Sequence, residues 1–369
     1  MHIPKRLVLA LVHVLSVISQ GSADVVASRE VFYVGGSYTD ITVGDTTRQY
    51  MIDQIYVEKL TPNYSTQPYP IVFIAGAGQT GTNFLQTPDD RPGWAAFFLR
   101  RGYTVYLTDQ PARGRSAWHP SIGSIAPAFS TEDVETLFTA TSTHNLWPQS
   151  YLHTQWPGSG RAGDPIFDAF YASQVQLQAD GLISEDSNTK AYTRLLDKIG
   201  KAYLLTHSQA GAYGWRVGDA RPGLVKGIIA VEPPGPPFVN LSPSGASSRT
   251  WGITDLEIVY EPSAGPNATN LNTITVPPKD ANHTECIIQA NPPKKLKYLS
   301  KVPVLLVTSE ASFQAASDYC TVRYLKQAGV DVEYADLGAE GIKGNGHFMF
   351  MEKNNVDIAT RIWRWLKRH

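Results

Sequence analysis

The stretch LLTHSQAGAYG, residues 204–214, joins an apolar run to a segment of small residues. The run KAYLLTH has the pattern of a buried strand, and AGAYGWRVGDARP that of the helix after it. Ser208 stands at the junction, with Thr206 at −2 and Ala210 at +2. Small residues are needed there when a nucleophile sits on a sharp strand-to-helix turn, although both glycines of the usual G-x-S-x-G are missing. The junction therefore predicts either a nucleophilic serine or an ordinary capped helix.

Outward from this junction, short apolar runs alternate with helical patterns along most of the chain. The runs end in polar or small residues, as in PYPIVFIAGAG, YTVYLTDQ, LVKGIIAVEPPG and VPVLLVTSE. Such alternation predicts an α/β protein with a mostly parallel sheet. Two further strands are predicted earlier in the chain, at EVFYVGGSYTD and RQYMIDQIYVEKLTP. Residues at about 112–185 and 236–300 are irregular, apart from a helix expected around 164–180. We interpret them as insertions in a single domain spanning 24–369, which ends in an amphipathic helix over 348–369.

The first 23 residues have the pattern of a signal peptide. Basic MHIPKR precedes apolar LVLALVHVLSVIS and the small residues of QGSA, and the apolar run is shorter than the roughly 20 residues of a membrane span. The sequence therefore predicts a secreted protein without stable membrane insertion. Secretion makes a disulfide the expected state of the two cysteines, Cys286 and Cys320. Four N-x-S/T sequons are candidate glycosylation sites, at Asn63, Asn240, Asn267 and Asn282.

Composition and charge limit the possible partners. The net charge of −1 gives no support for nucleic-acid binding. No clustered His, Cys or Asp pattern suggests a metal, and no cofactor is expected. The glycine-rich AGAGQTG is not followed by the Lys-Ser/Thr of a phosphate-binding loop. A small molecule is the expected partner, and the sequence does not predict the oligomeric state.

A nucleophilic serine needs a histidine as its base, a carboxylate to orient that histidine and donors for the oxyanion. In open parallel sheets such groups lie at the carboxyl ends of the strands. His347, in the loop GIKGNGHFMFMEK after the last apolar run, is the histidine that satisfies the expected chain order. The backbone N–H of Gln209 and a second N–H from AGAGQTG are the expected oxyanion donors.

Together these segments resemble the α/β-hydrolase superfamily over nearly the whole mature chain, and more narrowly the secreted carboxylesterases of the esterase-713 type. The resemblance rests on THSQAG, DQPARGRS, IAVEPPG and EGIKGNGHFMFMEKN. It implies a central sheet of about eight strands with helices on both faces and a cap-like insertion. It also implies Ser208 as nucleophile, His347 as base, and the amides of Ala77 and Gln209 as the oxyanion hole.

The third member of the triad stays open between two glutamates. Glu232 ends the run LVKGIIAVE, and Glu310 ends the run VPVLLVTSE. The superfamily usually takes its acid after the later strand, which favours Glu310, whereas the narrower group takes it after the earlier strand, which favours Glu232. We expect Glu232, with Glu310 as the alternative and Asp318 or Asp336 behind both.

The leading hypothesis is a secreted serine esterase that cleaves carboxylic esters through a Ser-His-Glu triad and an acyl-enzyme. A lactone hydrolase or a tailoring hydrolase of secondary metabolism would use the same residues. A non-catalytic binding protein is the alternative from another class, and the presence of serine, histidine and both candidate acids argues against it. The substrate and its acyl length are not predicted by these residues.

Overall fold

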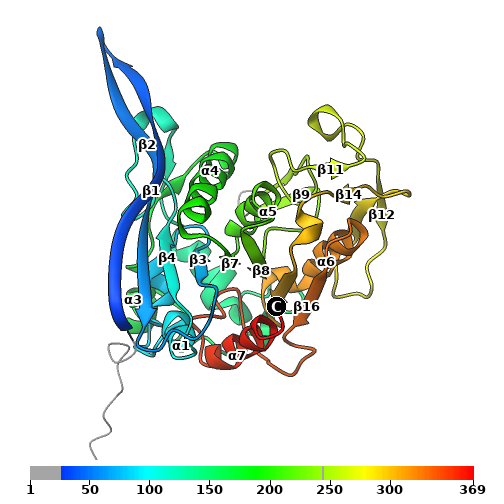
Figure 1. The fold of residues 1–369 in the computed structure, drawn as a ribbon. Helices are drawn as coiled ribbons and strands as arrows, with labels where there is room; N and C mark the ends of the chain where they lie inside the picture. Colours follow the sequence, from blue (N-terminus) through cyan, green and yellow to red (C-terminus); the bar gives the residue numbers. More distant parts are fainter. Residues whose placement is uncertain (1–25, 243–244) are drawn as a thin grey trace, which may run out of the picture.

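An eight-stranded sheet runs through the protein in the order β1-β2-β4-β3-β7-β8-β15-β16 (Figure 1). The computed structural model describes residues 26–242 and 245–369, so the predicted signal peptide lies outside the described residues. Every neighbouring pair from β4 to β16 is parallel. The sheet confirms the expected mostly parallel architecture. Its strands are β1 (Val26–Val43), β2 (Thr46–Pro62), β3 (Ile71–Ile74), β4 (Val105–Asp109), β7 (Ala202–His207), β8 (Val225–Val231), β15 (Val304–Thr308) and β16 (Val332–Asp336).

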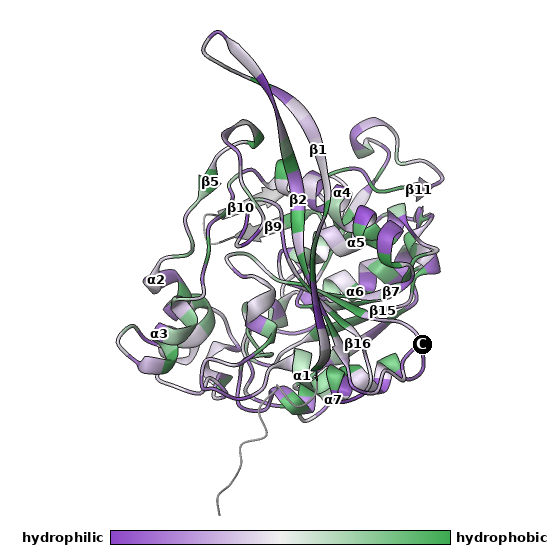
Figure 2. Cartoon of the chain, turned by 60° about the vertical axis from the view of Figure 1, so that its left-hand side comes forward, coloured by the Kyte–Doolittle hydropathy of each residue, from purple (hydrophilic) through white to green (hydrophobic). Residues whose placement is uncertain are grey.

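The first two strands form a long antiparallel hairpin, and β2 also pairs antiparallel with β4. The end of the hairpin that carries the turn projects well beyond the rest of the sheet (Figure 2). β2 is mostly exposed near that turn and becomes buried from Ile55 onward, just before its pairing with β4 begins at Tyr56. One half of the hairpin therefore belongs to the sheet, and the other half faces solvent.

Helices cover both faces of the sheet, which explains why its inner strands are almost continuously apolar. One apolar core joins the sheet to the helices α4 (Gly181–Ile199), α5 (Ala210–Ala220) and α6 (Asp318–Gln327). A second core joins the opposite face to α1 (Trp94–Leu99) and α7 (Asn355–Leu366). The expected closing helix is correct in its second half, but it begins at Asn355 rather than near 348.

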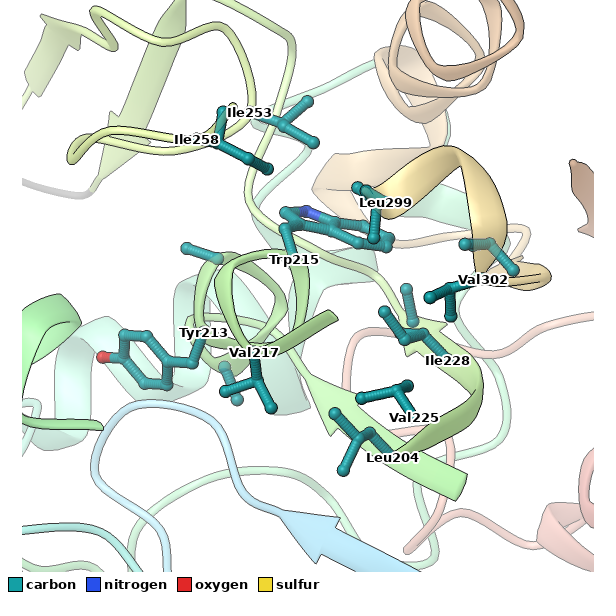
Figure 3. Close-up of a cluster of buried hydrophobic side chains, with 14 of the residues drawn as sticks. Leu204, Tyr213, Trp215, Val217, Val225, Ile228, Ile253, Ile258, Leu299 and Val302 are labelled. Carbon is teal, nitrogen blue, oxygen red and sulfur yellow. The ribbon is translucent and has the colours of Figure 1, made fainter. Parts of the chain in front are cut away.

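The helix after the Ser208 junction is held firmly between the sheet and the second irregular segment. Trp215 of α5 is completely buried and lies beside Ile253 and Leu299, while Leu204 and Ile228 come from the strands beneath (Figure 3). Truncating a buried side chain of this size lowers the stability of a protein by about 3–5 kcal/mol. The start of α5, and with it the turn at Ser208, is thereby fixed.

The two irregular segments carry only short elements. The helix expected around 164–180 is shorter than predicted: Asp164 caps it by accepting the N–H of Ile166 at 2.8 Å, and it ends at Tyr171. The short helices and strands are α2 (Thr131–Val134), α3 (Pro165–Tyr171), β5 (Ile125–Ala126), β6 (Leu177–Gln178), β9 (Val239–Ser242), β10 (Gly245–Ser248), β11 (Tyr260–Glu261), β12 (Thr273–Val276), β13 (Cys286–Gln289) and β14 (Lys295–Leu296). Single turns of other helix types are η2 (Gly81–Phe84), η3 (Pro120–Ile122), η4 (Glu135–Thr139), η5 (Thr141–Thr143), η6 (Ser150–Leu152), η7 (Pro266–Ala268), η8 (Leu299–Lys301) and η9 (Phe313–Ala316).

Candidate active site

Ser208 lies on a tight turn between β7 and α5. Its φ of 51° is in the left-handed region, which is uncommon for a residue other than glycine. The backbone holds it there, because its N–H donates to the carbonyl of Val231 at 3.0 Å and its own carbonyl accepts the N–H of Gly211 at 2.8 Å. A Cβ on Gly211 would lie 2.5 Å from that of Pro233. Gly211, three residues after the serine, is therefore needed for the turn to pack against Pro233.

Glu232 occupies the matching position at the end of the neighbouring strand β8. Its φ is 46°, again left-handed, and its side chain is completely buried. One carboxylate oxygen accepts the amide N–H of Ser309 at 2.8 Å and also contacts the Ser309 hydroxyl. The other oxygen lies 2.5 Å from Nδ1 of His347. The structure thus brings the first of the two candidate glutamates against the candidate base.

His347 lies in the loop between β16 and α7 with only 2% of its surface exposed. Because a carboxylate can only accept, Nδ1 carries the proton of the contact with Glu232 and Nε2 is left as the acceptor. The imidazole ring lies 5.4 Å from the ring of Phe138 and 4.7 Å from that of Phe313. This tautomer is the one that a general base for a serine requires.

The loop that carries His347 is anchored by Glu352, which the sequence analysis did not single out. This buried carboxylate accepts the Gly346 N–H at 3.0 Å, the Asn345 side-chain amide at 2.8 Å and Nε2 of His153 at 2.7 Å. The sequence offers no signal for this role, because His153 lies almost 200 positions upstream. Glu352 therefore holds the two residues that directly precede His347.

The other candidate acids have different partners. Glu310 accepts the backbone N–H of Gly344 at 2.8 Å, and so holds the beginning of the His347 loop. Asp336 accepts the N–H of Ala339 at 3.1 Å in a turn after β16. Asp318 is completely buried and meets the hydroxyl of Thr308 at 2.5 Å. Burial and the neighbouring Glu232 raise the pKa of Asp318 well above its usual value, so this carboxyl is suited to remaining protonated.

His207 connects the serine turn with the His347 loop. Its Nε2 donates to the carbonyl of His347 at 3.0 Å, and the two rings are 4.6 Å apart. Burial, and then the proximity of His347, lower the pKa of His207 well below its usual value. His207 is therefore a neutral group. It holds the His347 backbone next to the serine turn, because His207 directly precedes Ser208. With its Nε2 engaged by the carbonyl of His347, His207 is not placed to act as the base.

The expected oxyanion loop follows β3, next to the serine turn. A Cβ on Gly76 would lie 2.9 Å from that of Ser208, so the loop touches the turn directly. Gly78 has a φ of 71°, a conformation that favours glycine. Within residues 26–242 and 245–369, no hydrogen-bond acceptor lies within reach of the N–H of Ala77 or of Gln209. Both amides are therefore available to a ligand.

No group of three His, Cys, Asp or Glu side chains that could hold a metal ion occurs among the residues that the structure describes. Among the same residues, no helix is both long enough and apolar enough to cross a membrane.

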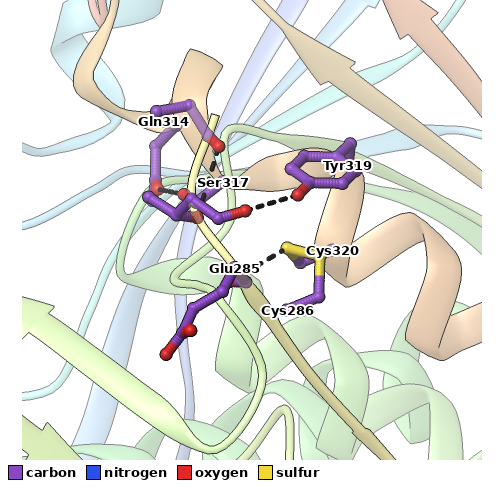
Figure 4. Close-up of a disulfide and its surroundings, with 8 residues drawn as sticks. Glu285, Cys286, Gln314, Ser317, Tyr319 and Cys320 are labelled. Carbon is purple, nitrogen blue, oxygen red and sulfur yellow. Dashed lines mark hydrogen bonds between the residues drawn. A yellow bond between two sulfur atoms is a disulfide. The ribbon is translucent and has the colours of Figure 1, made fainter. Parts of the chain in front are cut away.

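The expected disulfide is present between Cys286 of β13 and Cys320 of α6 (Figure 4). It ties the second irregular segment to the helix after β15. Glycosylation stays a prediction: the side chain of Asn240 is outside the described part, and the other three sequon residues are exposed, namely Asn63, Asn267 and Asn282.

Comparison with known proteins places this geometry in a family. No protein-family model matches the chain. A protein named "Probable secreted lipase phiG", from Fungal sp. (strain ATCC 74256), is 64% identical over 337 residues, which cover 91% of this chain and 89% of that protein. The solved structure of a novel bacterial esterase has the same fold, with a TM-score of 0.62 at 21% identity over 93% of this chain and 96% of the esterase. The chain therefore belongs to the α/β-hydrolase superfamily, as a secreted carboxylic ester hydrolase related to that fungal protein.

Proposed function

We propose that Ser208, His347 and Glu232 form a catalytic triad that hydrolyses carboxylic esters through an acyl-enzyme. The observation that carries this proposal is the contact of 2.5 Å between Nδ1 of His347 and the buried carboxylate of Glu232. This contact leaves Nε2 of His347 free to accept a proton. The neighbouring His207 is hydrogen-bonded to the His347 backbone, which supports a position of the imidazole beside Ser208.

In the first half of the proposed reaction, Oγ of Ser208 attacks the ester carbonyl while Nε2 of His347 takes its proton. The carbonyl electron pair moves to the oxygen, where the N–H groups of Ala77 and Gln209 donate to the resulting oxyanion. Each such donor contributes roughly 3 kcal/mol to the stability of the transition state. The tetrahedral intermediate then collapses, the bond to the alcohol oxygen breaks, and His347 returns the proton to the leaving alcohol.

In the second half, water takes the place of the alcohol. His347 removes a proton from the water as its oxygen attacks the acyl carbonyl, and the same two amides bind the second oxyanion. Collapse of that intermediate breaks the bond to Ser208, whose oxygen recovers the proton from His347, and the carboxylic acid leaves. Glu232 stays ionised throughout and stabilises the imidazolium that forms twice in each cycle.

We propose that the ester carries an apolar acyl or alkyl group. Aromatic side chains stand beside the reacting groups: Phe138 and Phe313 flank His347, and Phe129 lies within 3.6 Å of the position of a Cβ on Gly78. Apolar contact with such rings contributes binding energy in proportion to the area buried. The name of the fungal relative, a lipase, supports the same class of substrate.

A panel of p-nitrophenyl esters of increasing acyl length tests both parts of the proposal. Ser208→Ala should lower kcat by several orders of magnitude, because triad members act as a unit. Ser263→Ala, at an exposed serine of the second irregular segment, is the matched control and should leave kcat unchanged. An aryl phosphonate should label Ser208, as read by peptide mass spectrometry. Ester cleavage by Ser208→Ala near the wild-type rate would refute the mechanism, and equal kcat/KM from acetate to longer esters would refute the apolar substrate.

A further inference from the structure

Arg113, in the loop after β4, is a charged side chain buried behind the proposed oxyanion hole. Only 1% of its surface is exposed. One terminal nitrogen of its guanidinium donates to the carbonyl of Gly76 at 2.7 Å, and the other donates to Oε1 of Gln209 at 3.0 Å. The Gly76 carbonyl belongs to the same peptide group as the N–H of Ala77. A single side chain therefore holds both residues whose amides are the proposed oxyanion donors.

The charge of this guanidinium is not balanced by a carboxylate in contact with it. Both acceptors are neutral oxygens, and among the described residues no carboxylate lies at ion-pair distance from Arg113. Asp109, the acid of the same loop, is instead paired with Arg115 at 2.7 Å. Burial lowers the pKa of Arg113, but an arginine keeps its proton in proteins. Burying such a charge without an ionic partner costs several kcal/mol, so stability of the fold does not account for its position.

We propose that Arg113 is the positioning residue of the oxyanion hole. It orients the Gly76–Ala77 peptide and the Gln209 residue so that their N–H groups converge on the substrate oxygen, and its buried charge stabilises that oxygen when it becomes negative. This inference rests on the proposed function, since it assigns a role in the same reaction. The counter-charge that the resting protein lacks is then supplied by the transition state.

Such a role has a kinetic signature. The carbonyl oxygen of a bound ester is neutral, so a cation held behind the two amides acts mainly after the oxyanion forms. Loss of Arg113 should therefore lower kcat and leave KM almost unchanged. Removal of one direct oxyanion donor costs about 10²–10³ in kcat. Because Arg113 acts through the amides of its neighbours, we expect a loss of about 10- to 100-fold, below that of a direct donor.

The test compares Arg113→Met and Arg113→Lys with wild-type protein, using one p-nitrophenyl ester and an alkyl boronic acid. The boronic acid binds a serine nucleophile as a tetrahedral anion, so its Ki reports stabilisation of the oxyanion. In Arg113→Met, kcat should fall and Ki should rise by similar factors, with Arg113→Lys between this variant and wild type. Arg115→Met, in the same loop, is the matched control: it removes the ion pairs with Asp109 and Glu58, and should lower Tm without changing kcat or Ki.

A purely structural role for Arg113 would lower Tm and leave both kcat and Ki unchanged, and that result would overturn the inference. If neither Arg113 variant folds, Gln209→Ala decides, because it keeps the backbone amide and removes one acceptor of the guanidinium. It should then show a smaller, matched change in kcat and Ki, and no change would overturn the inference. Failure of the proposed function is distinguishable from failure of this inference. It would appear as full activity of Ser208→Ala in a protein that keeps Arg113.

Discussion

Replacing Glu232 with glutamine keeps the shape of the side chain and removes its charge, so it tests the proposed triad directly. One oxygen of Glu232 accepts the N–H of Ser309 at 2.8 Å and the other contacts Nδ1 of His347 at 2.5 Å. A glutamine has a single acceptor oxygen. The Ser309 N–H is fixed by the backbone and can only donate. The glutamine oxygen should therefore face Ser309, and the NH₂ group should face His347.

An NH₂ group beside Nδ1 forces His347 to accept there and to carry its proton on Nε2. That nitrogen could no longer take the proton of Ser208. The same change of tautomer in a serine protease lowers kcat by about 10⁴, which corresponds to about 5 kcal/mol of transition-state stabilisation. We therefore expect Glu232→Gln to lose activity on that scale while remaining folded, because the shape of the completely buried side chain is preserved.

Glu310→Gln is the matched control. Its glutamine oxygen can still accept the N–H of Gly344, so the loop should keep its shape and kcat should stay close to that of the wild type. The assay is steady-state kcat on one p-nitrophenyl ester, with circular dichroism and a thermal melt to establish folding. A folded, active Glu232→Gln together with a folded, inactive Glu310→Gln would refute the assignment and transfer the role to the later strand.

Three further predictions concern the close packing, the disulfide and a buried carboxyl. Gly76→Ala should abolish ester cleavage, because its Cβ would lie 2.9 Å from that of Ser208. In the control Gly181→Ala the new Cβ meets no atom within 4 Å, so kcat should stay unchanged. Equal kcat values for the two variants would contradict this prediction. Replacing both cysteines of the disulfide with serine should lower the free energy of unfolding by about 3–4 kcal/mol for a closed loop of this length, measured by urea denaturation; an unchanged midpoint would contradict it. Burial raises the pKa of Asp219 to about 6, so the folded protein loses stability as the pH rises from about 4 through about 6. Asp219→Asn should therefore raise Tm at about pH 8 but not at about pH 3.5, and an equal rise at both would refute this account.

The positions of the strands could be predicted because parallel strands in this fold are buried on both faces and appear as short apolar runs. The polar residue after each run then marks the carboxyl edge of the sheet, where Ser208, Glu232 and Glu310 all lie. The choice between the two glutamates could not follow from this pattern, because both satisfy it. Only the path of the loop that carries His347 brings one of them into contact, and that path depends on tertiary contacts.

Helix boundaries were predicted less well where burial is complete. The segment Phe348–Met351 was assigned to the closing helix, but all four of its side chains are buried in turns before α7. Two of their carbonyl groups are satisfied by side chains from outside the segment: Asn355 donates to the carbonyl of Phe350, and Arg91 donates to that of Met351. An apolar run without polar interruptions has no period, so it does not distinguish a helix from packed turns.

Some of the residues that break local rules lie in the proposed site. Ser208 and Glu232 adopt left-handed backbone conformations that glycine would adopt without strain, at a cost of about 1–3 kcal/mol each. Glycine at these two positions would remove that cost, but it would also remove the side chains of the proposed nucleophile and acid. Arg113 and Glu232 are likewise charged groups in a fully buried region, where apolar residues would be cheaper. Strain and buried charge at adjoining strand ends are thus retained against stability, and this is the pattern expected where geometry is selected for chemistry.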